Sequence, residues 1–203
     1  MATKSYPNFT YNDIENLAIE VKKKTLNLSS ENIMPSLLLR ETLDFNLQLP
    51  LDTESAKSHL IVSPILNELR RINNSYFTYF TGYNFNIDAK LGLKGFCDFL
   101  LTKELHTPTI QAPVIGIVEA KKDNVDEAVP QCIAMLYAAQ LFNQKKKIPT
   151  EMLYGICTTG FEWLVVELNE KKASIDTQRY YLVQLPELLS VLQNIINYYK
   201  VKY

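Results

Sequence analysis

Two short apolar runs, each interrupted by an acidic residue, constrain the fold of this 203-residue chain more than any other feature. They are the segments GFCDFLLTK (residues 95–103) and PVIGIVEAKK (residues 113–122). Runs of this length bounded by loop-forming residues are typical of central strands in a sheet. A stretch rich in Ala, Gln, Leu and Met follows from about Val125 to Gln144 and predicts a helix. The sequence therefore predicts an α/β protein.

The first fifty residues predict helices. Thr10 with Asp13 can cap a helix start, and apolar residues then recur at helical spacing. A second short helix is expected around MPSLLLRETL, residues 34–43. We therefore expect an N-terminal helical extension over residues 1–50, beside a main domain over residues 51–203.

The rest of the chain predicts a mixed sheet with helices on its faces. Further helices are expected from about Thr53 to Arg71 and from Pro186 onward, and further strands over residues 75–88 and around residues 178–185. The segments MLYGICTTG and FEWLVVEL form a predicted hairpin about Thr159-Gly160. Because short loops join the first strands, we expect the sheet to be mixed.

The balance of charge excludes a strong global field. The chain has 21 Lys and Arg against 22 Asp and Glu, so any contact with a polyanion must be local. Candidate patches are the lysine runs 22–24, 121–122, 145–147 and 171–172, although such runs are more often solvated surface. The three cysteines lie apart in apolar runs, which favours buried thiols over a zinc site. With no signal-like or membrane-spanning apolar stretch, we expect a cytoplasmic protein with no membrane partner.

Two carboxylates stand where the pattern predicts buried strand. Asp98 lies between Cys97 and Phe99, and Glu119 ends the apolar run of the next strand. An ionised carboxylate is costly to bury without a cation, a metal or strong donors beside it. Side chains alternate along a strand, so Glu119 and Lys121 should project from the same face. The three side chains are therefore the candidate site.

A purely structural interpretation of these residues is also open. Glu119 and Lys121 can form an ion pair at the end of a strand, and Asp98 can cap a neighbouring backbone group. A single Glu-x-Lys triplet is weak evidence for chemistry. The combination is stronger, because an acid inside one apolar strand is joined by an acid and a lysine on one face of the next.

This arrangement resembles the PD-(D/E)XK nuclease superfamily, which has the restriction-endonuclease-like fold. The matching residues are Asp98, twenty intervening residues, and then Glu119-Ala120-Lys121. The segments SAKSHLIVSPILNEL, AVPQCIAMLYAAQ and YGICTTGFEWLVVEL are similar to the nuclease part of type I restriction motor subunits. The similarity covers roughly residues 50 to 170. It implies a mixed central sheet flanked by helices, to which the N-terminal helical segment would be an addition.

The resemblance also implies further site residues, and the chain departs from the family pattern in places. Cys97 stands where the family name places a proline. Related nucleases carry Gln and Tyr four residues apart on the helix after the strands. Here Gln131 can supply the first, but Met135 stands at the second position and Tyr137 falls later.

The family also uses a glutamate from the helix before the strands. Glu54 and Glu68 are both candidates for this metal-binding and catalytic role. Of the two, we favour Glu68 from the sequence, because it is closest to the predicted sheet.

The chemistry of these residues suits hydrolysis of a phosphodiester. Carboxylate ligation by Asp98 and Glu119, with the backbone carbonyl of Ala120, suits a hard cation such as Mg²⁺ or Mn²⁺. Lys121 would orient or deprotonate the attacking water, or stabilise developing negative charge. Lys122 and the 145–147 run could grip the phosphate backbone without reading sequence.

The leading hypothesis is thus a DNA endonuclease of restriction type, with DNA favoured over RNA as the substrate. A homodimer is an option because cutting both strands needs two sites. The alternatives are a catalytically inactive nuclease-fold protein that binds nucleic acid or acts as a scaffold, and an ordinary α/β interaction protein.

Overall fold

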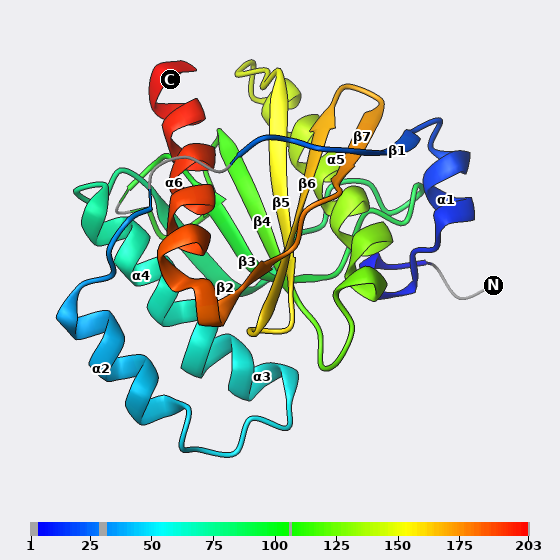
Figure 1. Cartoon of the computed structure of the whole chain (residues 1–203). Helices are drawn as coiled ribbons and strands as arrows, with labels where there is room; N and C mark the ends of the chain where they lie inside the picture. Colours follow the sequence, from blue (N-terminus) through cyan, green and yellow to red (C-terminus); the bar gives the residue numbers. More distant parts are fainter. Residues whose placement is uncertain (1–3, 29–31, 106, 203) are drawn as a thin grey trace.

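The computed structural model describes residues 4–28, 32–105 and 107–202, which form an eight-stranded mixed sheet with helices on both faces (Figure 1). The strands are β1 (Glu20–Lys24), β2 (Thr78–Asn84), β3 (Phe96–Thr102), β4 (Val114–Ala120), β5 (Met152–Thr158), β6 (Glu162–Asn169), β7 (Lys172–Asp176) and β8 (Tyr180–Tyr181). The α-helices are α1 (Tyr11–Asn16), α2 (Leu37–Asn46), α3 (Glu54–Lys57), α4 (Ser63–Ile72), α5 (Val129–Lys145) and α6 (Leu185–Lys202). Short helical turns are η1 (Tyr6–Asn8), η2 (Ser58–Val62), η3 (Val125–Ala128) and η4 (Leu182–Gln184). The predicted α/β class and mixed sheet are confirmed.

The sheet order is β1-β7-β6-β5-β4-β3-β2. The short strand β8 also pairs with β6 but is not part of this linear order. Strands β4 and β5 run parallel and are joined through α5, whereas β3 pairs antiparallel with both β2 and β4. The predicted hairpin is confirmed as β5–β6, which pair antiparallel. The carboxyl end of β4 therefore lies in the middle of the sheet, directly before the connection to α5.

Each face of the sheet has its own apolar core. On one face, α5 packs with α1 and the N-terminal segment against β4, β5 and β6. On the other, α2, α4 and α6 cover the sheet, as Figure 1 shows on the opposite side. None of the helices in the described part of the chain combines the length and apolar character that a membrane crossing requires.

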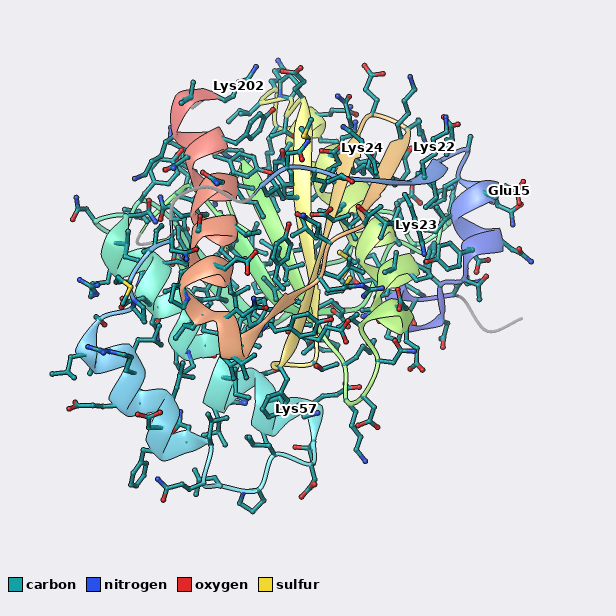
Figure 2. The ribbon with its side chains drawn as sticks, in the orientation of Figure 1. Glu15, Lys22, Lys23, Lys24, Lys57 and Lys202 are labelled. Carbon is teal, nitrogen blue, oxygen red and sulfur yellow. The ribbon has the colours of Figure 1, made fainter. Side chains whose placement is uncertain are left out.

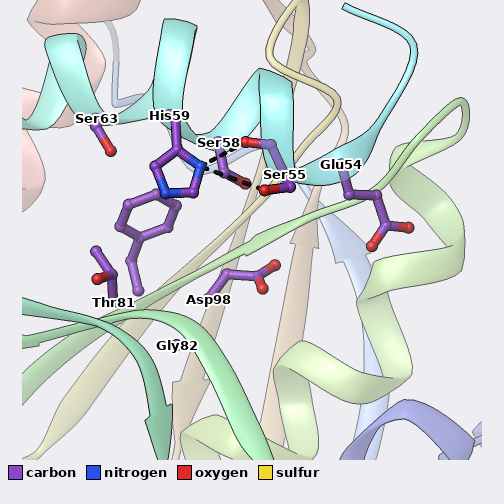
Figure 3. Close-up of a pocket in the computed structure, with 9 residues that line it drawn as sticks. Glu54, Ser55, Ser58, His59, Ser63, Thr81, Gly82 and Asp98 are labelled. Carbon is purple, nitrogen blue, oxygen red and sulfur yellow. Dashed lines mark hydrogen bonds between the residues drawn. The ribbon is translucent and has the colours of Figure 1, made fainter.

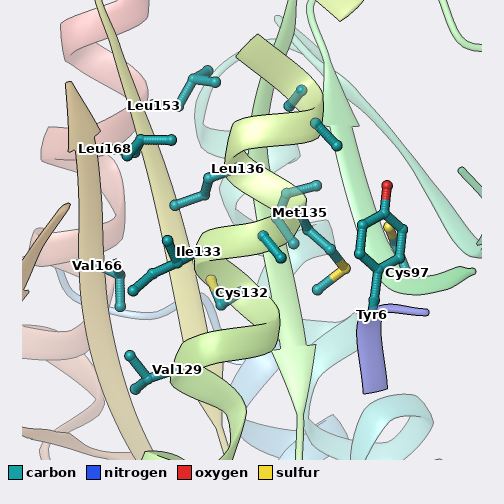
Figure 4. Packing of buried hydrophobic residues seen from close by; sticks show 14 of the residues in the cluster. Tyr6, Cys97, Val129, Cys132, Ile133, Met135, Leu136, Leu153, Val166 and Leu168 are labelled. Atoms are coloured by element: carbon teal, nitrogen blue, oxygen red, sulfur yellow. The ribbon is translucent and has the colours of Figure 1, made fainter. Parts of the chain in front are cut away.

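Helix α5 lies very close to the sheet, and a glycine makes this possible (Figure 4). A Cβ on Gly155 of β5 would lie 2.3 Å from Cys132 Sγ and 3.0 Å from Leu136 Cδ1. Cys97, Cys132 and Cys157 are all buried free thiols, as the sequence predicted. This close packing fixes the start of α5 against the end of β4.

The prediction of a purely helical N-terminal segment is wrong. Helices α1 and α2 form, and Thr10 and Asp13 make the expected capping box. Between the two helices, however, β1 joins the sheet by pairing parallel with β7. Tyr6 is fully buried, and its hydroxyl donates to the Phe85 carbonyl at 2.8 Å. Residues 4–24 thus contribute to the main core, in which Tyr6, Phe9, Ile14 and Ile19 are buried.

Strand β1 forms one edge of the sheet and carries three successive lysines. Figure 2 shows Lys22, Lys23 and Lys24 along this edge. Lysines on an edge strand oppose pairing with another chain. At the other end of the chain, the strand expected around residues 178–185 is only two residues long, and β7 precedes it unpredicted.

The helix predicted from Thr53 to Arg71 forms, with a π-helical turn inside it. Thr53 caps α3 by accepting from the Ala56 amide, and η2 is a π-helix that continues directly into α4. A π turn inserted into an α-helix often marks a functional site.

Candidate active site

The carboxylates of the candidate site meet at the end of β4. Phe99 of β3 pairs with Val118 of β4 in antiparallel register, so the next pair in that register is Asp98 with Glu119. Residues opposite each other on neighbouring strands project from the same face. Asp98 also reaches β4 directly, because its Oδ2 accepts a hydrogen bond from the Ala120 amide at 2.8 Å. The sequence prediction that Asp98, Glu119 and Lys121 lie together agrees with this geometry.

Glu119 is 3% exposed, and its two oxygens have different surroundings. Its Oε1 accepts from Lys121 Nζ at 2.9 Å and also from Gln131 Nε2. Its Oε2 is buried and has no hydrogen-bond partner among the residues that the structure describes. A buried polar atom without a partner is rare in folded proteins and requires an explanation. Half of this carboxylate is therefore unsatisfied by the protein.

Burial raises the pKa of Glu119 to about 8, and the negative charge of Asp98 acts in the same direction. Lys121 opposes the rise without cancelling it. Burial likewise raises the pKa of Asp98, against the opposing effects of the Ala120 amide and Lys121. Asp98 thus disfavours the charged form of Glu119, and Glu54 that of Asp98, which is typical of sites that bind a cation or transfer protons.

Lys121 is fixed by two acceptors on its ammonium group. Nζ donates to Glu119 Oε1 and, at 3.0 Å, to Oε1 of Gln131 from α5. An ammonium has three donors, so one remains for a ligand. Burial lowers the pKa of Lys121, but Glu119, Glu54 and Asp98 together outweigh burial and raise the pKa. The lysine therefore stays cationic in the free protein.

Gln131 lies where the family resemblance implied, in contact with both Glu119 and Lys121. It is buried in the first turns of α5, immediately after the chain leaves β4. Tyr137 lies elsewhere, because its ring stacks with Lys171, whose Nζ is 3.7 Å from the ring centroid. Only the first residue of the Gln and Tyr pair thus contributes to the site.

The structure places Glu54, and not Glu68, beside the two strand acids. Glu54 begins α3, lines a cleft with Asp98 and acts electrostatically on Asp98, Glu119 and Lys121. Glu68 is buried on α4, where Arg71 and Ser36 bind both its oxygens. The Arg71 guanidinium and the Ser36 donors hold the pKa of Glu68 below its usual value despite burial. The preference for Glu68 is corrected, since its charge is already neutralised.

A cleft of about 320 Å³ opens between the α3–η2–α4 helix and strand β2, and Asp98 is among the residues that line it (Figure 3). Besides Glu54 and Asp98, its lining includes the polar side chains of Ser55, Ser58, His59, Ser63 and Thr81. The sequence analysis did not select these residues. The four-residue spacing of Ser55, His59 and Ser63 on one helix was the available signal.

A buried lysine joins the helix to the end of β4. Lys57 is 8% exposed and donates to the Lys122 carbonyl. Its ammonium also lies 5.7 Å from the centre of the Phe161 ring. The sequence analysis missed Lys57, which holds the turn after Lys121 in place.

Most of the lysine runs lie away from the acids. Lys145 is fourteen residues beyond Gln131 on α5, which at 1.5 Å per residue is about 21 Å along the helix. Lys145 Nζ donates instead to the Ile87 carbonyl. Lysines 22–24 lie on the edge strand β1, several strands from β4. Lys122, in contrast, directly follows Lys121 of the site.

The donor set fits a hard divalent cation in part. Two carboxylates approach each other, one has an unpartnered buried oxygen, and a third, Glu54, lies close enough to affect their charges. Within the described residues, no three His, Cys, Asp or Glu side chains converge into a complete ligand cluster. A magnesium site needs only one or two carboxylates, since water and phosphate fill the other positions.

No family model, curated protein or solved structure matches this chain in the three comparisons made.

Proposed function

We propose that this protein is a metal-dependent nuclease that hydrolyses phosphodiester bonds in DNA, with a restriction-endonuclease-like architecture. The observation that carries the proposal is the buried Glu119 carboxylate with one unpartnered oxygen, beside Asp98 and a cationic Lys121. A mixed sheet with helices on both faces, and a parallel β4–α5–β5 unit directly after the acids, is compatible with it.

Asp98 and Glu119 would hold Mg²⁺ or Mn²⁺, with the Ala120 carbonyl as a further ligand and Glu54 as the helix acid. When bound, the cation would neutralise charge on the phosphate oxygens and lower the pKa of a bound water. Glu119 keeps Oε1 for Lys121 and Gln131, so its free Oε2 is the oxygen available to a metal. Asp98 is positioned by the Ala120 amide, which keeps its carboxylate at the end of β4.

Lys121 would stabilise negative charge that develops on the phosphate and orient the attacking water. Its raised pKa favours this electrostatic role over that of a general base in the free protein. Gln131 fixes the ammonium from the side of α5, leaving the third donor to point at substrate.

Substrate contact would be made mainly with the phosphate backbone, which carries no sequence information. Lys122 is the exposed lysine adjacent to the site and would contribute a contact that weakens with salt. A homodimer would bring two such sites to the two strands of a duplex.

The decisive experiment is to compare wild type with Lys121→Ala on supercoiled plasmid and on single-stranded DNA in Mg²⁺ and Mn²⁺. We expect wild type to cut DNA and Lys121→Ala to cut at least about 100-fold more slowly. A decrease of this size is the effect of removing one electrostatic donor to the transition state. Manganese binding by calorimetry should persist in the variant. Lys90→Ala, an exposed lysine in the loop before β3, controls for the loss of one charge. Equal cutting by Lys121→Ala and wild type would refute the assignment.

A further inference from the structure

The cleft beside Asp98 carries a row of polar side chains that the carboxylate site does not use. Ser55, His59 and Ser63 follow one another at four-residue intervals and all line the cleft. In a regular α-helix, side chains at this spacing drift around the axis. The π turn of η2 is wider and offsets the drift, so the row continues to face the cleft. Thr81 on β2 lines the same cleft, and Figure 3 shows it facing the His59 side.

The His59 ring is held in a defined orientation. Its Nδ1 lies 2.7 Å from the Ser55 carbonyl oxygen, which can only accept, so Nδ1 carries the proton. Figure 3 shows this bond on one side of the ring, with the rest of the ring turned to the cleft. Nε2 is therefore the nitrogen available to a ligand. An imidazole whose other nitrogen is fixed by a backbone carbonyl is oriented in advance.

The strand opposite leaves room for a ligand. Thr81 of β2 pairs with Phe99 of β3 in antiparallel register. The next residue of β2, Gly82, therefore lies opposite Asp98. A Cβ at Gly82 would have nothing within 4 Å, so open space adjoins Asp98 here. Among the lining residues that the structure describes, none is Lys or Arg. The charged residues that line the cleft with His59 are Glu54, on the same helix, and Asp98, and both are acidic.

We propose that this polar row is a subsite for the phosphodiester backbone of the nucleotide adjoining the cleaved bond. His59 Nε2 and the hydroxyls of Ser63 and Thr81 would be its hydrogen-bonding groups. Hydroxyl side chains commonly contact phosphate oxygens and sugars. This inference rests on the proposed nuclease function, because the Asp98 end of the cleft must hold the phosphate that is cut.

Contact with a phosphate oxygen requires a proton on Nε2. Both ring nitrogens are donors in the imidazolium form, so His59 would donate to the Ser55 carbonyl and to the phosphate at once. The proton comes from solvent, and no covalent bond to the substrate forms. Binding should therefore engage Nε2 as a donor and change its nitrogen-15 resonance.

Nitrogen-15 NMR of the imidazoles tests this directly, because the chain has only two histidines. The probe is the dinucleoside monophosphate dTpdT, added with Mg²⁺ to Lys121→Ala so that it is not cleaved. We expect dTpdT to shift the Nε2 resonance of one histidine, and His59→Asn to lack that response. No change in the His59 signals at millimolar dTpdT would overturn the proposal.

Kinetics provide the second test, with a matched pair of threonine variants. Thr81→Val and His59→Asn should raise KM for plasmid cleavage about fivefold to tenfold, the effect of one lost hydrogen bond, with little change in kcat. Thr42→Val, in a separate cleft between α2 and α4, should leave both constants unchanged. Normal KM in both cleft variants would refute the subsite.

The two proposals fail in distinguishable ways. If wild type binds no manganese and cuts no DNA, yet His59 responds to dTpdT, the nuclease assignment fails and the phosphodiester subsite stands. If wild type cuts DNA while His59 does not respond and KM is unaffected, the subsite is wrong and the nuclease assignment stands.

Discussion

Replacing Glu119 with Gln should stabilise the metal-free protein at neutral and alkaline pH, although it removes a charged partner of Lys121. Gln has nearly the shape of a protonated Glu and can still accept from Lys121 and Gln131. The substitution therefore mimics the protonated wild type. Wild type loses folding stability when the Glu119 carboxyl ionises, and the Gln variant avoids this loss.

The magnitude follows from the pKa of about 8 in the folded protein against a reference value of 4.5. The folded state holds its proton more tightly than the unfolded state, so between pH 4.5 and 8 it binds more protons. Stability then falls as pH rises through this window. At about 1.4 kcal/mol per pH unit, wild type loses about 3 kcal/mol by pH 7 and at most about 5 kcal/mol above pH 8. Glu119→Gln should show no such loss of stability, because Gln does not ionise.

Urea denaturation in the presence of EDTA, from pH 5 to pH 8.5, measures the difference. The two proteins should be nearly equal in stability at pH 5, and the variant should gain steadily above it. Glu127→Gln, at an exposed position on η3, controls for the loss of one negative charge. A difference that does not grow with pH, or a less stable variant at pH 8, would mean that Lys121 fully compensates an ionised Glu119. The structural ion-pair interpretation would then be preferred.

Three further predictions concern the metal site and the packing. Manganese should raise the melting temperature of wild type and of Glu68→Gln but not of Asp98→Asn, as calorimetric scans would show; an equal response in all three would place the metal elsewhere. Gly155→Ala should lower the free energy of unfolding, measured with urea, by about 1–3 kcal/mol, because its Cβ would overlap Cys132 Sγ. Unchanged stability would mean that α5 can shift away from the sheet. Tyr6→Ala should lower the free energy of unfolding by about 3–5 kcal/mol in the same assay, because it truncates a buried aromatic side chain. If the N-terminal segment were separable from the main core, this substitution would hardly change the free energy of unfolding.

The strand acids could be predicted because their signal is local. Asp98 and Glu119 interrupt runs that otherwise read as buried strand, and the two-residue period of a strand places Lys121 beside Glu119. Gln131 was implied by the family resemblance, which places a Gln on the helix after these strands. The capping residues Thr10 and Thr53 are also local signals, and both mark helix starts in the structure.

The helix acid and the edge strands could not be predicted because they depend on distant contacts. Residues 20–24 contain three lysines, and only pairing with β7, some 150 residues later, makes them a strand. Proximity in sequence favoured Glu68, but helix α4 turns that side chain toward Ser36 and Arg71. The wider π turn lies between Glu54 and Glu68, and nothing in the spacing of apolar residues revealed it.

The two buried glutamates of this protein provide an internal comparison that bears on function. Glu68 and Glu119 are 4% and 3% exposed, and each has a cationic partner at 2.9 Å. At Glu68 the donors satisfy both oxygens, and the pKa falls below its usual value. At Glu119 one oxygen has no partner in the described part of the chain, a second acid lies alongside, and the pKa rises to about 8. The same fold can therefore compensate a buried carboxylate completely, and the incomplete compensation at the end of β4 supports the cation site that we propose there.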